Sequence, residues 1–213
     1  MKVFVVGANG QIGQHLVQLL KASTEHTVRA MVRKQEQVEA FEKVGVEARL
    51  ADLEGSVDEI AEAAKGCDAI VFTAGSGGHT GADKTLLIDL DGAAKTIEAA
   101  QKIGIQRFIM VSAIHAHRRE KWSSIKHYMV AKHHADKILE QSGLTYTIIR
   151  PGGLLNEPGT GKVSIAEDLE TASIPREDVA QTILAALPME NTFNRSFDLV
   201  SGEDAISAAL DQL

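Results

Sequence analysis

The stretch Gly7-Ala8-Asn9-Gly10-Gln11-Ile12-Gly13 decides the fold of this chain, because an apolar run (2–6) precedes it and an amphipathic segment (15–20) follows it. A strand, a tight glycine turn and a helix in this order bring free backbone N–H groups and the positive end of a helix dipole to one point. Glycine allows steep dihedral angles and close approach of a ligand there. Asn9-Gly10 alone is also typical of a hairpin turn, but the strand and helix around it predict a phosphate site.

The same context predicts which phosphate is bound. A strand before the glycines and a helix after them are the conditions that confirm a dinucleotide-binding motif, with a pyrophosphate on the helix N-terminus. The spacing is G-x-x-G-x-x-G and differs from the G-x-G-x-x-G of the commonest dehydrogenases. The residues of this loop expected to contact the cofactor are Gly7, Asn9, Gly10, Gln11, Ile12 and Gly13.

The composition argues against several classes of partner. The 213 residues, of which 44% are hydrophobic, are enough to bury one good core. A net charge of −7 disfavours nucleic acid and anionic membranes as partners. No segment approaches the ~20 apolar residues of a membrane helix, and the early first strand leaves no room for a signal peptide. We therefore expect a cytoplasmic monomer or homodimer that acts on a small molecule, with the single Cys67 as a buried hydrophobe.

Short apolar runs alternate regularly with helical patterns as far as Ile149. Runs this rich in Val, Ile and Phe suit parallel strands that are covered on both faces. The alternation predicts an α/β fold, a Rossmann-like doubly wound parallel sheet in three layers. The expected strands are Val3–Val6, Thr27–Val32, Glu47–Leu50, Ala69–Phe72, Arg107–Val111 and Thr145–Ile149. The expected helices are Gln11–Lys21, Gln35–Val44, Val57–Lys65, Lys84–Ile103 and Lys126–Gln141.

The pattern changes after Pro151. A loop, a short strand at Lys162–Ala166, a helix at 177–187, a strand at Phe197–Val200 and a terminal helix are expected. Residues 152–213 are too few for an independent second domain. We expect one NAD(P)-binding domain over residues 1–213, in which about 152–213 form a small cap at the substrate side.

The end of the second expected strand bears on the choice of cofactor. NAD-binding proteins place a carboxylate about twenty residues beyond the glycines to bind the ribose hydroxyls. This chain has Arg33-Lys34 there and no acid before Glu36. Arg33 and Lys34 suit the extra phosphate of NADP(H), although two solvated charges after a strand are the plainer alternative and NAD(H) stays possible.

Two further loops are expected at the cofactor. Asp52-Leu53 closes the third strand and Thr73-Ala74-Gly75 follows the fourth, at the strand ends where adenine and its ribose should lie. Asp52 can accept a hydrogen bond from the adenine amino group or cap the helix that starts near Ser56. The glycine-rich loop lets backbone approach a flat ligand, or is a turn without ligand contact.

Tyr128 and Lys132 form a Y-x-x-x-K on an expected helix, so that phenol and ammonium lie on one face, one turn apart. A lysine held there favours the phenolate and lowers the pKa of the tyrosine, which makes an acid or base for neutral pH. The fifth strand ends at Val111-Ser112, where Ser112 supplies a hydroxyl at the same edge of the sheet or serves only as a loop serine.

Together these motifs resemble the short-chain dehydrogenase/reductase superfamily. More closely, the chain resembles its atypical members, the NAD(P)H-binding or NmrA-like group named for NAD-dependent epimerases and dehydratases. The resemblance spans almost the whole chain. It rests on Gly7–Gly13, Asp52-Leu53, Thr73-Ala74-Gly75, Val111-Ser112-Ala113, Tyr128–Lys132, Ile149-Arg150-Pro151-Gly152 and Pro175–Ala180.

The resemblance implies a role for each matching residue. It implies that Ser112 positions a substrate carbonyl, that Tyr128 transfers its proton and that Lys132 hydrogen-bonds the nicotinamide ribose. It also implies that Pro151 and Gly152 run beside the nicotinamide.

The chain departs from the family pattern in two places. Extended members have an asparagine in their catalytic site where this chain has Asp89. The carboxylate of Asp89 could still orient Lys132 through a water, but its charge would change the coupling to the lysine. The large C-terminal domain that binds nucleotide sugars in true epimerases is also missing from the pattern, so we do not expect sugar epimerisation.

Five histidines gather at His115, His117, His127, His133 and His134. No carboxylate stands at ligand spacing from them in the sequence, so we expect no metal site.

Two functions are compatible with these motifs. The first is an NADPH-dependent oxidoreductase that transfers hydride to a small carbonyl, quinone or flavin-like acceptor, with Tyr128 as general acid/base. The second is a catalytically weak module that senses the NADP(H) redox state and passes it to a partner, because fold alone does not decide function. An intact Tyr128–Lys132 pair favours the enzyme.

Overall fold

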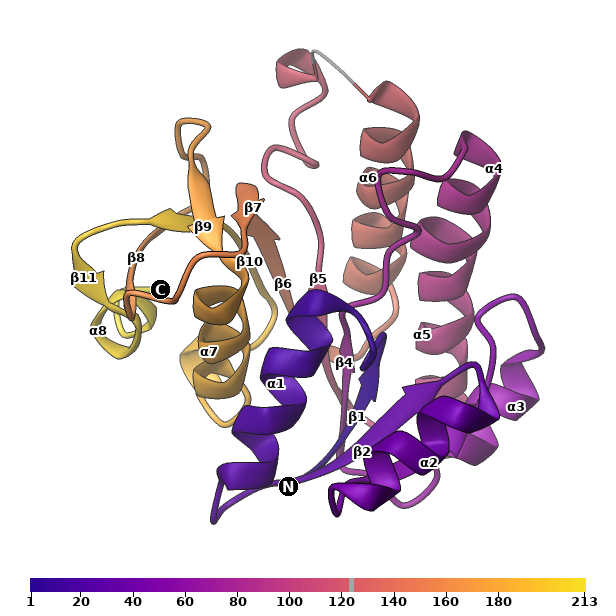
Figure 1. Cartoon of the computed structure of the whole chain (residues 1–213). Coiled ribbons are helices and arrows are strands. Elements are labelled where there is room, and N and C mark those ends of the chain that lie inside the picture. The colour runs from indigo at the N-terminus through magenta and orange to yellow at the C-terminus, as the bar shows by residue number, and fades with distance from the viewer. Residues whose placement is uncertain (123–124) are drawn as a thin grey trace.

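The computed structural model describes residues 1–122 and 125–213 (Figure 1). Its main sheet has the strand order β11-β8-β10-β6-β5-β4-β1-β2-β3, and β7 and β9 form a separate two-stranded sheet. The strands are β1 (Lys2–Val6), β2 (Thr27–Val32), β3 (Glu47–Leu50), β4 (Ala69–Phe72), β5 (Arg107–Val111), β6 (Thr145–Pro151), β7 (Gly153–Leu155), β8 (Lys162–Ala166), β9 (Ser173–Pro175), β10 (Arg195–Ser201) and β11 (Asp204–Ala205). The helices are α1 (Gln11–Ala22), α2 (Gln35–Lys43), α3 (Val57–Ala64), α4 (Ala82–Lys84), α5 (Gly92–Ile103), α6 (Lys126–Glu140), α7 (Arg176–Ala186) and α8 (Ile206–Leu210), with a π-helix η1 (Thr85–Asp91) and short 3₁₀ turns η2 (Arg119–Lys121) and η3 (Glu190–Thr192).

The first six strands are parallel and doubly wound. β1 pairs with β2 on one side, with Val6 beside Met31, and with β4 on the other, with Val6 beside Phe72. The strand order therefore reverses at β1 and β4, which is where ligands bind in open α/β sheets, at the C-terminal ends of the strands. The Rossmann-like fold predicted from the alternation is confirmed.

Alternation along β1 divides the interior between the two faces of the sheet. Val3 and Val5 belong to a core that includes residues of α1, α2 and α7. Phe4 and Val6 belong to a second core, which includes residues of α3, α5 and α6. Because successive side chains of a strand point to opposite faces, a strand covered on both sides must be apolar throughout. The three layers can be followed in Figure 1, where α5 and α6 lie on one side of the sheet and α1 and α7 on the other.

The segment after β6 extends the main sheet. β10 pairs in parallel with β6, and β8 and β11 continue the sheet in antiparallel directions. α7 packs against α1 (Figure 1). Only β7 and β9 stand apart, and β7 begins at Gly153, directly beyond the C-terminal end of β6. Most strands of residues 152–213 thus enlarge the main sheet, and the small cap at the substrate side stays a prediction.

The helix expected over Lys84–Ile103 is divided, which corrects that prediction. α4 is a single turn, η1 is π-helical, and regular α-helix begins only at Gly92. The wide π turn places Thr85 and Asp89, four residues apart, on one buried side. Gly92 brings the start of α5 against Leu53, since a Cβ at Gly92 would lie 3.1 Å from the Leu53 Cβ.

No helix within residues 1–122 and 125–213 is both long and apolar enough to cross a membrane.

Candidate active site

The glycine loop packs closely against the loop after β4. Gly7 has φ +85°, and a Cβ there would lie 2.7 Å from the backbone nitrogen of Ala74. A Cβ at Gly13 would overlap the carbonyl oxygen of Gly7. Gly10 is different, because its Cβ would meet only that same oxygen, at 3.1 Å, and the residue is exposed. Gly7 and Gly13 thus serve packing, whereas Gly10 leaves its outer side open to a ligand.

The N-terminus of α1 fits a pyrophosphate. Gly10 is the N-cap and offers no side-chain acceptor, and the first turn of α1 carries no acidic residue. The first N–H groups of a helix have no partner within the helix, so an anion can satisfy them here. Ile12 is buried in the core and can contribute only its backbone. The strand–turn–helix predicted around these glycines is present, and its polar groups suit an NAD(P) dinucleotide.

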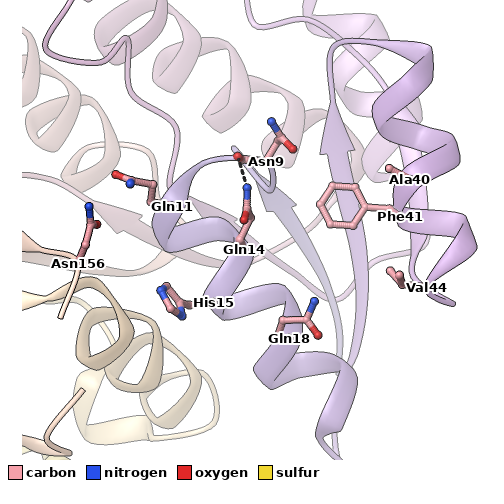
Figure 2. Close-up of a pocket in the computed structure, with 9 residues that line it drawn as sticks. All are labelled: Asn9, Gln11, Gln14, His15, Gln18, Ala40, Phe41, Val44 and Asn156. Atoms are coloured by element: carbon pink, nitrogen blue, oxygen red, sulfur yellow. Dashed lines mark hydrogen bonds between the residues drawn. The ribbon is translucent and has the colours of Figure 1, made fainter. Parts of the chain in front are cut away.

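A groove of about 640 Å³ runs along the outer side of α1 (Figure 2). It starts at Asn9 and Gln11 and continues past further polar side chains of α1, with Phe41 of α2 and the following Val44 opposite. Gln14 lies within it and donates to the carbonyl of Asn9 at 2.9 Å. The groove shares only Asn9 and Gln11 with the residues expected at the cofactor, so it adjoins the dinucleotide loop and is not the expected substrate site.

Arg33 stands at the C-terminal end of β2 with an exposed guanidinium that has no carboxylate within ion-pair distance in residues 1–122 and 125–213. Lys34 is also exposed, and its Nζ lies 3.5 Å from Glu36. Arg33 is thus the less engaged of the two at the strand end where the sequence predicts the additional phosphate of NADP(H).

Asp52 does not cap the next helix. Its Oδ1 accepts from the backbone N–H of Glu54 at 2.9 Å, while α3 begins with a complete capping box formed by Ser56 and Glu59. The Asp52 carboxylate is exposed beside the end of β2, because the N–H of Ala51 donates to the Val32 carbonyl. Leu53, in contrast, is buried beneath Gly92 and can reach a cofactor only through its backbone.

The loop after β4 joins the glycine loop to the Tyr128–Lys132 region. The Thr73 hydroxyl donates to the Val6 carbonyl at 3.0 Å, which ties the ends of β4 and β1 together. Ala74 lies against Gly7, as described above, and Gly75 is exposed. One residue further, the N–H of Ser76 donates to Asp89 Oδ2 at 2.9 Å.

Asp89 and Lys132 form a buried ion pair. Asp89 is 0% exposed and Lys132 4%, and Lys132 Nζ lies 3.5 Å from Asp89 Oδ1. Lys132 also donates to the carbonyl of Val111 at 3.0 Å, at the end of β5. Burial disfavours the ammonium, but Tyr128, Asp89 and Asp136 together raise the pKa of Lys132, so it is held as a cation.

Tyr128 lies beside Lys132, with 5.8 Å between Lys132 Nζ and the centre of the Tyr128 ring. The four-residue spacing thus places phenol and ammonium together, as predicted. The predicted effect on the phenol is wrong. Burial raises the pKa of Tyr128 above its ordinary value, Asp89 and Asp136 raise it further, and Lys132 offsets only part of this.

Ser112 lies at the end of β5 with its hydroxyl turned toward a second buried ion pair. Arg150 Nε donates to Asp136 Oδ2 at 2.8 Å, and Arg150 is 1% exposed. Burial raises the pKa of Asp136, whereas Arg150, Ser112 and Lys132 lower it in part. Neither Ser112 Oγ nor Asp136 Oδ1 has a hydrogen-bond partner in the part of the chain that the structure describes.

Sequence reasoning missed this second pair. Arg150 reaches Asp136 from β6, and its Nη2 lies 3.6 Å from Glu140. A signal was present, because Asp136 and Glu140 continue the four-residue spacing of Tyr128 and Lys132 along one face of α6. A carboxylate on the buried face of a helix needs a partner of opposite charge, so this spacing indicates a cation on a neighbouring element.

Pro151 and Gly152 lie at the C-terminal end of β6, next to the loop after β5. The Pro151 carbonyl accepts from Ile114 N–H at 2.9 Å, and Gly152 N–H donates to the carbonyl of Leu199 at 2.9 Å. A Cβ at Gly152 would overlap the carbonyl oxygen of Ala172. Gly152 is therefore required for packing, and its contact with the nicotinamide stays a prediction.

Tertiary structure brings carboxylates to the histidines, contrary to the sequence spacing. The ligand atoms of His115, Asp168 and Asp198 all lie within 4.8 Å of one another. Their atoms are engaged, however. His115 Nε2 lies 2.6 Å from the Leu169 carbonyl, Lys121 pairs with Asp168 at 2.6 Å, and Asp198 accepts from two backbone N–H groups. The cluster joins the loop after β5 to the loop after β8, and it offers no free ligand set of the kind a cation needs.

Comparison with known proteins identifies the family. A family model described as NAD(P)H-binding matches residues 7–190. The YhfK protein of Bacillus subtilis, named as an uncharacterized sugar epimerase, is 66% identical over the whole of both chains. Among solved structures, a Bacillus halodurans protein assigned to the NAD-dependent epimerases/dehydratases is 43% identical, with a TM-score of 0.94 and full coverage of both chains. The oxidoreductase ylbE of Lactococcus lactis is 36% identical, with a TM-score of 0.91 over 100% of this chain and 96% of that one. The chain belongs to the NAD(P)H-binding family.

Proposed function

We propose that the protein is an NADPH-dependent oxidoreductase that reduces a small carbonyl, quinone or flavin-like acceptor. The observation that carries this proposal is an unbroken series of contacts between the dinucleotide loop and the Tyr128–Lys132 pair. Gly7 packs on Ala74, Ser76 binds Asp89, and Asp89 pairs with Lys132. We expect a dinucleotide that binds at α1 to end beside this buried cation and phenol, which are groups that binding alone does not require.

The choice of NADPH rests on the end of β2. Arg33 is exposed, cationic and without a carboxylate within ion-pair distance in residues 1–122 and 125–213, and the nearest acid in sequence, Glu36, lies 3.5 Å from Lys34. A guanidinium binds a phosphate through two parallel hydrogen bonds and stacks on an adenine ring. The carboxylate that binds the ribose hydroxyls of NAD has no counterpart at this position.

The residues at the strand ends divide the chemistry between them. A bound NADPH supplies the hydride. Lys132 would hold the nicotinamide ribose, Ser112 would orient the acceptor carbonyl, and Tyr128 would donate its proton to the oxygen that becomes an alkoxide. For a quinone or a flavin the proton can come from water, and Tyr128 then matters less.

The segment after β6 supports a small acceptor over a nucleotide sugar. β10, β8 and β11 are used to enlarge the sheet, and β7 and β9 are short strands at the end of β6. Most strands of residues 152–213 thus belong to the main sheet, and we favour reduction of a small acceptor over the epimerisation in the name of the Bacillus subtilis relative.

The test is NADPH consumption with panels of aldehydes, quinones and flavins, comparing the parent with Tyr128→Phe. Loss of the general acid should lower kcat for a carbonyl by about 10²–10⁴, while NADPH affinity changes little because the ring remains. Tyr146→Phe is the matched control, since Tyr146 lies within β6 and should not affect turnover.

Two outcomes would contradict the proposal. Equal carbonyl turnover by Tyr128→Phe and the parent would show that Tyr128 donates no proton. Tight NADPH binding without turnover of any acceptor, in both proteins, would favour the redox-sensing module instead.

A further inference from the structure

Asp89 places a negative charge where it meets the charge of Lys132 directly. Its Oδ2 accepts from Ser76 N–H, and its Oδ1, 3.5 Å from Lys132 Nζ, has no hydrogen-bond partner in the described part of the chain. The position is 0% exposed, so water does not screen this carboxylate. An asparagine could accept the same hydrogen bond from Ser76. The charge is therefore the property that distinguishes Asp89 from an asparagine here.

The charges around the Tyr128 phenol come from two elements. α6 contributes Lys132 and Asp136, and η1 contributes Asp89. Asp136 is in turn paired with Arg150 of β6. In the part of the chain that the structure describes, Lys132 and Arg150 thus each have a carboxylate partner.

We propose that Asp89 neutralises Lys132 and thereby keeps Tyr128 as an uncharged phenol, so that the site donates a proton in reduction and does not act as a base for oxidation. The direction of reaction rests on the proposed function, whereas the state of the phenol does not. Burial of Tyr128 and the adjoining carboxylates acts in the same sense, because each raises the pKa of that phenol.

The protonation state of Tyr128 matters differently in the two directions of the reaction. In reduction, NADPH would supply the hydride and leave as NADP⁺, so that a C–H bond of the cofactor is exchanged for a new C–H bond at the acceptor carbon. The π electron pair of C=O moves to oxygen, and that oxygen takes the Tyr128 proton. Tyr128 then regains a proton from water. In the reverse direction Tyr128 would first have to lose its proton, which is unfavourable beside Asp89.

Tyrosinate absorbance tests the proposal on the cofactor-free protein. The chain has only two tyrosines, so Tyr146→Phe leaves Tyr128 as the single titrating phenol. In the Tyr146→Phe protein, which is the parent for this experiment, we expect no tyrosinate below about pH 10, the ordinary range of a tyrosine. Adding Asp89→Asn should produce about tenfold more tyrosinate at a given alkaline pH, the scale on which a neighbouring charge acts.

Asp91→Asn is the matched control, because Asp91 lies in the same π-helix but is exposed and pairs with Lys95. It should leave the titration unchanged. A Tyr128 that ionises below pH 10 in the parent, or an Asp89→Asn titration equal to that of Asp91→Asn, would overturn the proposal. Circular dichroism at each pH reports folding, and if Asp89→Asn does not fold, the parent titration decides. Absence of turnover with every acceptor would remove the proposed function and leave this result unaffected.

Discussion

Arg33 and Tyr128 both lie where the sequence predicts, but the pKa of Tyr128 differs from the prediction. The Arg33 guanidinium stands exposed at a strand end, as the sequence predicts. Tyr128 stands beside Lys132, also as predicted, yet burial and two carboxylates hold its pKa up when the lysine alone would bring it down. At the residue scale, position follows from local spacing, whereas protonation depends on everything packed around the group.

Arg33→Ala should weaken NADPH binding and leave NADH binding unchanged. Loss of one charge-assisted contact to a phosphate costs on the order of 1.5–3 kcal/mol, which corresponds to about ten- to a hundredfold in Kd. Fluorescence titration with both cofactors measures this. Lys34→Ala should have a smaller effect, because Lys34 already faces Glu36. Equal affinities for the two cofactors in the parent would contradict the expected preference.

At the scale of elements, α1 and the turn before it were predictable, because every group they require is within one short stretch of sequence. Gly7 in the turn and Gly13 in α1 are needed for packing, and α1 begins after Gly10 without a side-chain cap. The π-helix η1 was not predictable. Its apolar pattern is that of an ordinary helix, and the wider turn, in which Thr85 and Asp89 are both buried, is seen only in the structure.

Gly→Ala changes at Gly10 and Gly13 should affect different properties: Gly13→Ala should lower stability, and Gly10→Ala should weaken NADPH binding. Gly13→Ala should lower the free energy of unfolding by about 1–3 kcal/mol, because its methyl group overlaps the Gly7 carbonyl. Gly10→Ala should cost less than about 1 kcal/mol yet weaken NADPH binding, since its methyl group points toward the pyrophosphate. Thermal unfolding and cofactor titration separate the two. A Gly10→Ala protein that binds NADPH normally would show that this glycine serves the turn alone.

At the scale of the whole molecule, buried groups connect the C-terminal segment to the rest of the sheet. Asp198 of β10 accepts from His115 N–H in the loop after β5 and from Leu169 N–H in the loop after β8. His117 lies in the same region, and neither of its ring nitrogens has a hydrogen-bond partner in residues 1–122 and 125–213. Burial lowers the pKa of His117 to about 4, with Arg150 and Arg118 adding to the effect.

This histidine should make the fold less stable in acid. As pH falls below 6.5 the unfolded chain binds a proton at His117 that the folded protein accepts only near pH 4. Stability is therefore complete above pH 6.5 and is lost as the pH falls toward 4. The ring is partly exposed, so after screening by solvent we expect about 1 kcal/mol at pH 5, or roughly 2–4 °C in Tm.

Comparing Tm at pH 7 and pH 5 tests this. The decrease should be smaller in His117→Phe than in the parent, and unchanged in His134→Phe, which alters an exposed histidine of α6. An equal decrease in all three proteins would show that His117 is not responsible.

The sequence by itself determined the Rossmann-like sheet, the dinucleotide loop and the juxtaposition of Tyr128 with Lys132. Each of these depends on a pattern within one element or on the rule that parallel strands end at one edge. Only the tertiary structure decided that Arg150 meets Asp136, that Asp198 meets His115, and that Asp89 neutralises the lysine beside Tyr128. These contacts join residues far apart in the chain, so they depend on how the elements pack. The pKa of a buried group depends in turn on water excluded and charges brought near by that same packing.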